Sequence, residues 1–209
     1  MANFKRKLHL FHSNKFVTVV NEAIEFFTQT PIHVLPPPDK FLGQGIYALY
    51  YCGNFEHYAK LSEINKASCE LPIYVGKAVS PGWRTARINI SKSPDIYRRL
   101  GEHSRSISQT LNLELDDFRC RFMIFGDIEA DLIVPVEASL IRKYKPLWNS
   151  LIDGFGNHNP GKGRYHQAKS DWDVIHPGRI WADWLTGEAA SLENLINKVH
   201  NEMDSLSFP

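Results

Sequence analysis

Two short segments rich in aromatic and apolar residues most constrain how this chain can fold. Residues 45–51 (GIYALYY) and 72–76 (PIYVG) have the length and composition of β-strands, and turn-forming residues follow the second one. Each segment places a tyrosine, Tyr47 or Tyr74, between smaller apolar neighbours. If the two strands pair antiparallel, both hydroxyl groups can emerge on one face of the sheet. Strand tyrosines are commonly packing residues, so the pair alone leaves a structural and a functional interpretation open.

Five other segments are expected to be helical, and they are residues 15–29, 58–64, 93–111, 134–145 and 192–203. Ser93 is the expected N-cap of the third, Pro94 suits its first helical position, and Pro146 ends the fourth. Residues 117–125 alternate between apolar and polar side chains and predict a third strand. The order strand, strand, helix, strand, helix predicts an α+β fold, in which a small antiparallel sheet of three core strands is flanked by helices.

The length of 209 residues is typical of one domain that buries its own core. We expect a single domain in which residues 1–40 form an N-terminal helical arm, residues 41–150 the core, and residues 151–209 a C-terminal extension. The extension contains a Gly- and Asn-rich stretch at residues 153–164, which is too polar to be expected in the hydrophobic core.

The composition, with 43% hydrophobic and 22% charged residues, is that of an ordinary globular protein. The three cysteines form no CxxC pair, which argues against a disulfide framework and favours a reducing compartment. The chain opens with charged residues that no signal-peptide apolar segment follows, and no apolar run approaches the ~20 residues of a membrane span. We therefore expect a cytoplasmic protein with no membrane partner.

Charge is segregated along the chain although the net charge is only +1. Residues 77–105 contain seven basic and two acidic side chains, and residues 142–169 contain six basic and one acidic. Seven acidic residues lie between them, in residues 114–137. The two basic stretches could form one electropositive face that binds nucleic acid, or two ordinary solvated faces.

Three polar residues on the predicted helices are candidates for chemistry. Arg99 and His103 are four residues apart and therefore share one helix face, where a phosphate-binding guanidinium would lie beside a titratable imidazole. Incidental charge on a surface helix is the alternative. Glu137 lies within an apolar stripe that should face the sheet, where a carboxylate needs a partner or a metal ion. It could instead be an acid of the first helical turn that assists capping.

Two motifs in the polar stretch are poor candidates. Residues 156–162 fit GxxxxGK, but Gly163 stands where a nucleotide-binding loop needs Ser or Thr, so no nucleotide cofactor is expected. His158 and His166 suggest a metal site or an HNH nuclease, but no further ligands follow at a recognisable spacing. A loop that is solvated or contacts DNA is the favoured interpretation.

Taken in order, these residues resemble the motifs of the GIY-YIG nuclease superfamily. The resemblance rests on Gly45-Ile46-Tyr47, Tyr74-Val75-Gly76-Lys77, Arg99, Glu137 and Asn149, and it covers residues 43–150. Val75 replaces the usual isoleucine, and the 26 residues between Tyr47 and Tyr74 exceed the short hairpin typical of the superfamily. That long spacing, His103 and the extended C-terminus are similar to the branch of type II restriction endonucleases.

The resemblance implies a role for each matched residue. Glu137 would bind one divalent cation, Mg²⁺, and Arg99 would neutralise charge on the scissile phosphate. Tyr47, or else Tyr74, would position or deprotonate the attacking water. A tyrosine has an ordinary pKa of about 10, so it needs nearby positive charge or a proton acceptor such as His103. Which of the three activates water stays open at this point.

The remaining matched residues have supporting roles in this scheme. Lys77 would add positive charge near the site, and Asn149 would orient a ligand or the water shell of the metal. The expected DNA contacts lie in the basic stretches, at Lys92, Arg98, Asn157, His158, Lys162 and Arg164.

A restriction endonuclease that cuts both strands of a palindrome needs two sites related by a two-fold axis, which implies a homodimer on double-stranded DNA. The branch also makes a GC-rich palindrome a natural target. Two alternatives are a repair or homing GIY-YIG nuclease and an inactive DNA-binding module. The sequence shows no second DNA-binding or repair domain, which argues against the first, and its intact tyrosines, Arg99 and Glu137 argue against the second.

Overall fold

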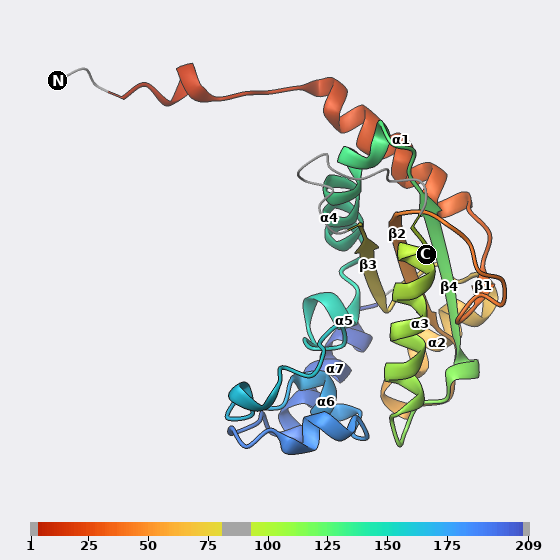
Figure 1. The fold of residues 1–209 in the computed structure, drawn as a ribbon, viewed down its shortest axis with the longest axis vertical. Helices are drawn as coiled ribbons and strands as arrows, with labels where there is room; N and C mark the ends of the chain where they lie inside the picture. Colours follow the sequence, from red (N-terminus) through yellow and green to blue (C-terminus); the bar gives the residue numbers. More distant parts are fainter. Residues whose placement is uncertain (1–3, 81–92, 207–209) are drawn as a thin grey trace.

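A four-stranded antiparallel sheet lies at the centre of the computed structural model, which describes residues 4–80 and 93–206 (Figure 1). The strands are β1 (His33–Val34), β2 (Gly45–Tyr51), β3 (Tyr74–Ala78) and β4 (Phe118–Ile124), in the order β1-β4-β2-β3. The predicted α+β class and the three predicted strands are confirmed. The two-residue strand β1 adds a short edge beside β4 that the sequence did not indicate.

The register of β2 and β3 places the two tyrosines on the same face, as predicted. Tyr47 is opposite Gly76, and Tyr74 is opposite Leu49, two residues further along β2. A Cβ atom on Gly76 would lie only 2.4 Å from the Tyr47 hydroxyl oxygen, so only glycine lets this ring lie across β3. Gly45 is equally constrained, because its Cβ would lie 2.0 Å from the Met123 carbonyl oxygen of β4. The glycines of both motifs therefore serve close packing around Tyr47.

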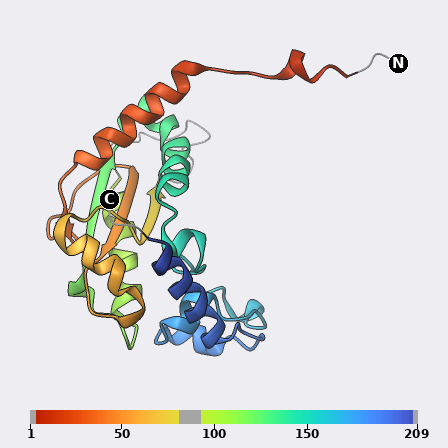
Figure 2. The same cartoon turned by 180° about the vertical axis from the view of Figure 1, so that it is seen from behind.

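Different helices cover the two faces of the sheet. The face that carries Tyr47, Leu49 and Tyr51, here called the tyrosine face, packs against α3 (Asp95–Ser108) and the C-terminal part of the chain. The opposite face packs against α1 (Asn14–Gln29) and α4 (Ile133–Tyr144), and Figure 2, the view from behind, shows α1 in red along the upper end of the strands. A further helix, α2 (Ala59–Ser68), connects β2 to β3. These are four of the five predicted helices, all near their expected positions, and the fifth is present in the C-terminal segment.

The ends of α3 differ from the prediction. Pro94, not Ser93, is the cap residue, and no side chain caps the helix. The Ser93 carbonyl instead accepts a hydrogen bond from Gly43 N at 2.8 Å. The helix also stops at Ser108, because Leu111 N donates to the Pro177 carbonyl at 2.9 Å and draws the chain toward the C-terminal segment.

The C-terminal segment contains α5 (Leu147–Ser150), α6 (Asp171–Ile175) and the predicted final helix α7 (Leu192–Ser205), which gather at one end of the molecule in Figure 1. The expectation that residues 153–164 stay outside the core was wrong for one residue. Phe155 is 1% exposed and packs between Trp148 and Trp172. One aromatic side chain thus anchors an otherwise polar stretch, and the burial of its ring outweighs the local composition.

The N-terminal residues 4–13 extend away from the body in both views (Figures 1 and 2). No helix within the described ranges 4–80 and 93–206 is long and apolar enough to cross a membrane.

Candidate active site

An open cleft with a volume of about 600 Å³ lies along the edge strand β3. It brings together predicted residues that are up to 111 positions apart, and those that line it are Tyr47, Tyr74, Lys77, Arg98, Arg99, Glu137 and His158. The position at an edge strand explains how they meet. Tyr47 and Tyr74 belong to the tyrosine face, whereas Lys77 is opposite Ile46 and belongs to the other face. Side chains from both faces can reach the cleft only at this edge.

Tyr47 and His103 form a buried pair behind the cleft. The Tyr47 hydroxyl oxygen is 2.7 Å from His103 Nε2, and both residues are 1% exposed. Burial is the main cause that raises the pKa of Tyr47 well above 10, and the neighbouring Tyr74 raises it further. Burial, followed by the charge of Arg99, lowers the pKa of His103 well below 6.5. At neutral pH the phenol is therefore protonated and shares this hydrogen bond with a neutral imidazole.

Glu137 is paired with Lys77 across the edge of the sheet. Its carboxylate Oε2 accepts a hydrogen bond from Lys77 Nζ, and the two side chains are 13% and 34% exposed. The helix α4 begins at Ile133 and has no acid in its first turn, so Glu137 is not the capping acid of the alternative interpretation. Its neighbours on the helix, Val136 and Leu140, are fully buried. The helix thus buries its apolar face while one carboxylate stays at the cleft.

Arg99 is held from two directions. Its Nη1 lies 2.8 Å from Glu102 Oε2 and 2.8 Å from His158 Nε2, and its Nη2 donates to the Gly156 carbonyl at 3.2 Å. The contact to Glu102 follows from helical spacing and could have been found in the sequence. The contacts to Gly156 and His158 could not, because they join α3 to a segment more than fifty residues away.

The position of Asn149 differs from the expected one. Its side-chain amide donates to the Val75 carbonyl at 2.8 Å and its Oδ1 accepts from Val75 N at 2.7 Å, so both amide groups are occupied. Asn149 does not line the cleft. Because β3 is an edge strand, its outer backbone groups have no strand to pair with, and the amide takes that place. Asn149 therefore braces the strand that carries Tyr74 and Lys77, and its expected role of orienting a ligand stays a prediction.

Comparison with known proteins identifies the family of the chain. The family model of the Eco29kI GIY-YIG domain matches residues 39–203, well over half of the chain. The chain belongs to this family. It is a family of type II restriction endonucleases, so the predicted GIY-YIG membership is confirmed and the domain is a nuclease domain. No curated protein matches the chain.

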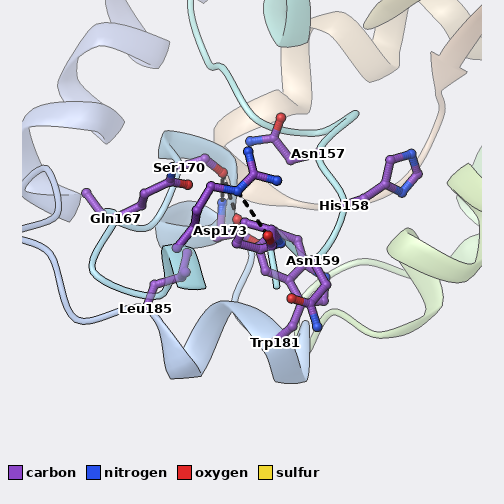
Figure 3. Close-up of a pocket in the computed structure, with 11 residues that line it drawn as sticks. Asn157, His158, Asn159, Gln167, Ser170, Asp173, Trp181 and Leu185 are labelled. Atoms are coloured by element: carbon purple, nitrogen blue, oxygen red, sulfur yellow. Dashed lines mark hydrogen bonds between the residues drawn. The ribbon is translucent and has the colours of Figure 1, made fainter. Parts of the chain in front are cut away.

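Four predicted DNA-contacting residues of this GIY-YIG domain lie on the segment after α5. Asn157, His158 and Arg164 line a second cavity of about 330 Å³ (Figure 3), and Lys162 begins the three-residue 3₁₀-helix that ends at Arg164. His158 lines both this cavity and the cleft. Lys162 and Arg164 are exposed. The second cavity thus adjoins the nuclease cleft.

The other two predicted contacts lie elsewhere. Arg98 is on α3 at the cleft, with a 59% exposed side chain that pairs with Asp95 at 3.1 Å. Lys92 lies outside the described residues, as do the turn residues Pro81 and Gly82.

Proposed function

We propose that this protein is a type II restriction endonuclease that hydrolyses phosphodiester bonds in double-stranded DNA at a specific site, with one divalent cation in each active site. One observation carries the proposal. Glu137 and Lys77 from one face of the sheet meet Tyr47 and Arg99 from the other face at a single open cleft. A carboxylate, two cations and a hydrogen-bonded tyrosine at one surface are the groups that phosphodiester hydrolysis requires.

The residues present fit one hard divalent cation. Glu137 Oε1 has no hydrogen-bond partner in the described structure, and Oε2 has only Lys77, which a cation can replace. The other two acids of the cleft are engaged, Asp95 with Arg98 and Glu102 with Arg99. No cluster of three acidic, His or Cys side chains occurs within the described ranges. Mg²⁺ commonly takes one or two protein carboxylates and fills its shell with water and phosphate oxygens, and it would supply charge for the phosphate and the leaving 3′ oxygen.

The chain's own residues divide the rest of the reaction. Arg99 faces the cleft and can neutralise the phosphoryl oxygens as charge develops. The Tyr47 hydroxyl can take a proton from water only as it passes its own proton to His103 Nε2, because its raised pKa keeps the phenolate unpopulated. We therefore favour Tyr47 for positioning the attacking water, with His103 as its proton acceptor. Tyr74, whose pKa is also raised by burial, is the less favoured alternative.

A homodimer on a palindromic, GC-rich site belongs to the same proposal. Residues 4–13 reach away from the body and expose the apolar side chains Phe4, Leu8 and Phe11 at 77%, 79% and 85%. Exposed apolar surface of this kind favours contact with another protein surface, and a second copy would supply the second active site. Arg164 offers donors that suit the guanine edge in the major groove, and Lys162 offers a positive charge for a phosphate.

The test is digestion of plasmid and phage DNA by the purified protein with Mg²⁺ or with EDTA. Wild type and Glu193→Gln, a control at an exposed acid of α7, should give discrete fragments with Mg²⁺. EDTA and Glu137→Gln should each abolish them, by at least about 10²-fold if the metal provides charge stabilisation. A smear would assign a repair or homing nuclease. Intact DNA that is retarded on a gel would leave only a binding module.

A further inference from the structure

A loop after α5 contacts both functional residues of α3. The Phe155 ring stacks on the His103 imidazole, with centroids 4.6 Å apart and planes 16° apart. The next residue, Gly156, accepts a hydrogen bond from Arg99 through its carbonyl, and His158 lies 2.8 Å from Arg99 Nη1. Residues 154–158 therefore form the wall against which His103 and Arg99 are oriented.

Besides the packing of Phe155 between Trp148 and Trp172, one guanidinium holds the backbone of this wall. Arg179 donates to the carbonyl oxygens of Gly154, Phe155 and Asn157 at 3.0, 3.1 and 3.2 Å. Its Nε donates to Asp173 Oδ1 at 2.6 Å, and both side chains are 1% exposed. All of the nitrogen atoms of the group are thus used, and three of its bonds end on the same short loop.

Two further contacts fix this arrangement. The Arg179 guanidinium lies 4.5 Å from the ring centroid of Trp172 and 4.7 Å from that of Trp181. Ser170 donates its hydroxyl to Asp173 Oδ2 at 2.7 Å, so the carboxylate has a partner on each oxygen, and Figure 3 shows this bond beside the second cavity. A buried ion pair that is satisfied this completely gives geometric specificity more than stability.

The side chain of Arg179 is bonded to the C-terminal segment and not to the sheet. Within the described residues, every side-chain hydrogen bond of Arg179 goes to residues 154–173, and none goes to a strand. A loop with Gly154 and Gly156 would otherwise sample many conformations, since glycine restricts the backbone least. The bonds of Arg179 therefore order a segment whose own contacts are to His103 and Arg99.

We propose that Arg179, paired with Asp173, is a positioning residue for the nuclease site, which holds residues 154–158 so that Phe155 orients His103 and Gly156 and His158 orient Arg99. The inference rests on the proposed function in assigning a catalytic consequence to that orientation. Arg179 is buried and touches no substrate, so its effect passes through the loop.

The surroundings of His103 provide a specific readout. The imidazole faces Tyr47 from β2, Tyr74 from β3, Phe155 and His158 from the loop, and Arg99 from its own helix, and Arg179 adds its charge from behind the loop. Release of the loop would admit water to the ring. Because burial is the largest cause that lowers the pKa of His103, that pKa should then rise toward its ordinary range.

The first experiment compares Arg179→Gln and Arg179→Lys with Arg121→Gln, a control at a buried arginine of β4 that has no contact with the loop. We expect the single-turnover cleavage rate to fall about 10–100-fold for Arg179→Gln, with partial recovery for Arg179→Lys. The acid limb of its rate–pH profile should move to higher pH, while DNA affinity changes less than the rate. An unchanged rate, or a pH profile that matches Arg121→Gln, would overturn the inference.

The second experiment needs no activity. Histidine ring signals of the full-length protein are followed by NMR as pH falls, and His103→Gln assigns the signal of interest. Arg179→Gln should raise the titration midpoint of His103, and an unmoved midpoint contradicts the inference. If Arg179→Gln does not fold, Phe155→Leu removes the stacked ring and leaves the Arg179–Asp173 pair intact. This variant must then show the same rise in the titration midpoint of His103. If Arg179→Gln raises the titration midpoint of His103 although the wild-type protein cuts no DNA, the positioning role of Arg179 stands and the proposed nuclease function is wrong.

Discussion

The two faces of the sheet are buried by different chemistry. The face opposite the tyrosines packs mainly aliphatic side chains of α1 and α4, such as Ile24 and Leu140, against Ile46 and Val75. The tyrosine face buries His103, His176 and Arg179 among aromatic rings, and each of these has hydrogen-bond partners. Buried polar groups need exact partners and define one geometry, whereas aliphatic packing tolerates adjustment. The aliphatic face therefore mainly stabilises the fold, whereas the tyrosine face positions the side chains of the candidate active site.

Glu137 joins the two faces, because its helix packs on the aliphatic side while its carboxylate reaches the cleft. If the division is correct, substitutions on the tyrosine face should change activity more than stability, and those on the other face should do the reverse.

The largest effect should follow from Tyr47→Phe. Loss of the hydroxyl removes the group that is hydrogen-bonded to His103 at 2.7 Å, and we expect the cleavage rate to fall about 10²–10⁴-fold, which corresponds to about 3–5 kcal/mol of activation free energy. The measurement is single-turnover cleavage with Mg²⁺, together with thermal unfolding to show that the variant is folded.

Tyr50→Phe is the matched control, because Tyr50 lies on the same strand, is 4% exposed and faces the other side of the sheet. Its rate should stay within about twofold of wild type if only the tyrosine face carries chemistry, as expected for a site outside the reaction geometry. Full activity of Tyr47→Phe would transfer water activation to Tyr74 or to His103 acting directly.

A somewhat smaller effect, and on a different quantity, should follow from Ile24→Ala on the opposite face. Ile24 is 8% exposed and packs in the cluster between α1 and the sheet. Removing its side-chain methylenes should lower the free energy of unfolding by about 2–5 kcal/mol. The cleavage rate of the folded fraction at low temperature should be unchanged. A rate loss comparable to that of Tyr47→Phe would break the division between the faces.

The elements of the fold that could be predicted are those with a local sequence pattern. The strands around Tyr47 and Tyr74, the helix of Arg99 and the helix of Glu137 each show a local pattern, and the structure contains all of them. Short-range periodicity is sufficient here because each helix buries one stripe against the sheet. Strand β1 was missed because two residues carry no measurable alternation.

The rest of the site arises from contacts between distant segments. No spacing in the sequence indicates that Phe155 stacks on His103, or that Arg179 binds three carbonyl groups of one loop. A glycine-rich polar stretch ordinarily predicts exposed loop, and one buried ring overrides that prediction only after the chain has folded. The contact of Asn149 with the backbone of Val75 was not foreseen either, because the edge of a sheet is visible only in three dimensions.

The buried histidines of the tyrosine face predict that the free energy of unfolding depends on pH. This effect is smaller than those of Tyr47→Phe and Ile24→Ala. Burial is the main cause that lowers the pKa of His176 to about 3, followed by the charges of His57 and Arg179. The unfolded chain therefore binds a proton near pH 6.5 and the folded chain does not, so stability decreases as pH falls from about 6.5 to about 3. The loss should be about 1.4 kcal/mol per pH unit for this group, or about 2–3 kcal/mol at pH 4.5.

Urea unfolding at pH 7 and pH 4.5 measures this loss directly. His176→Gln keeps a side chain that can hydrogen-bond with Asn112 and Tyr58, which His176 contacts at 3.0 and 2.7 Å. The variant should be less stable at pH 7 but should lose less stability on acidification. Equal losses in the two proteins would show that His176 does not titrate between the folded and unfolded states as inferred.

The smallest expected effect concerns the surface beyond both faces. Lys162 is exposed on the short helix that ends at Arg164 and is expected to contact a DNA phosphate. Lys162→Gln should weaken DNA binding about fivefold, about 1 kcal/mol, at 0.15 M salt, and should reduce the slope of log K against log salt by about 1. Filter binding over a series of salt concentrations measures both quantities, with Lys66→Gln on α2 as the exposed control.

The salt slope also distinguishes this lysine from Arg164, its neighbour on the same short helix. A side chain that contacts only phosphate should weaken binding to every sequence alike, whereas one that reads a guanine should lose about 1–3 kcal/mol for the cognate site alone. If Arg164→Gln lowers affinity uniformly and Lys162→Gln does so only for the cognate site, the roles are exchanged. If neither changes the slope, the loop after α5 serves the cleft through Arg99 and His103 and makes no phosphate contact of its own.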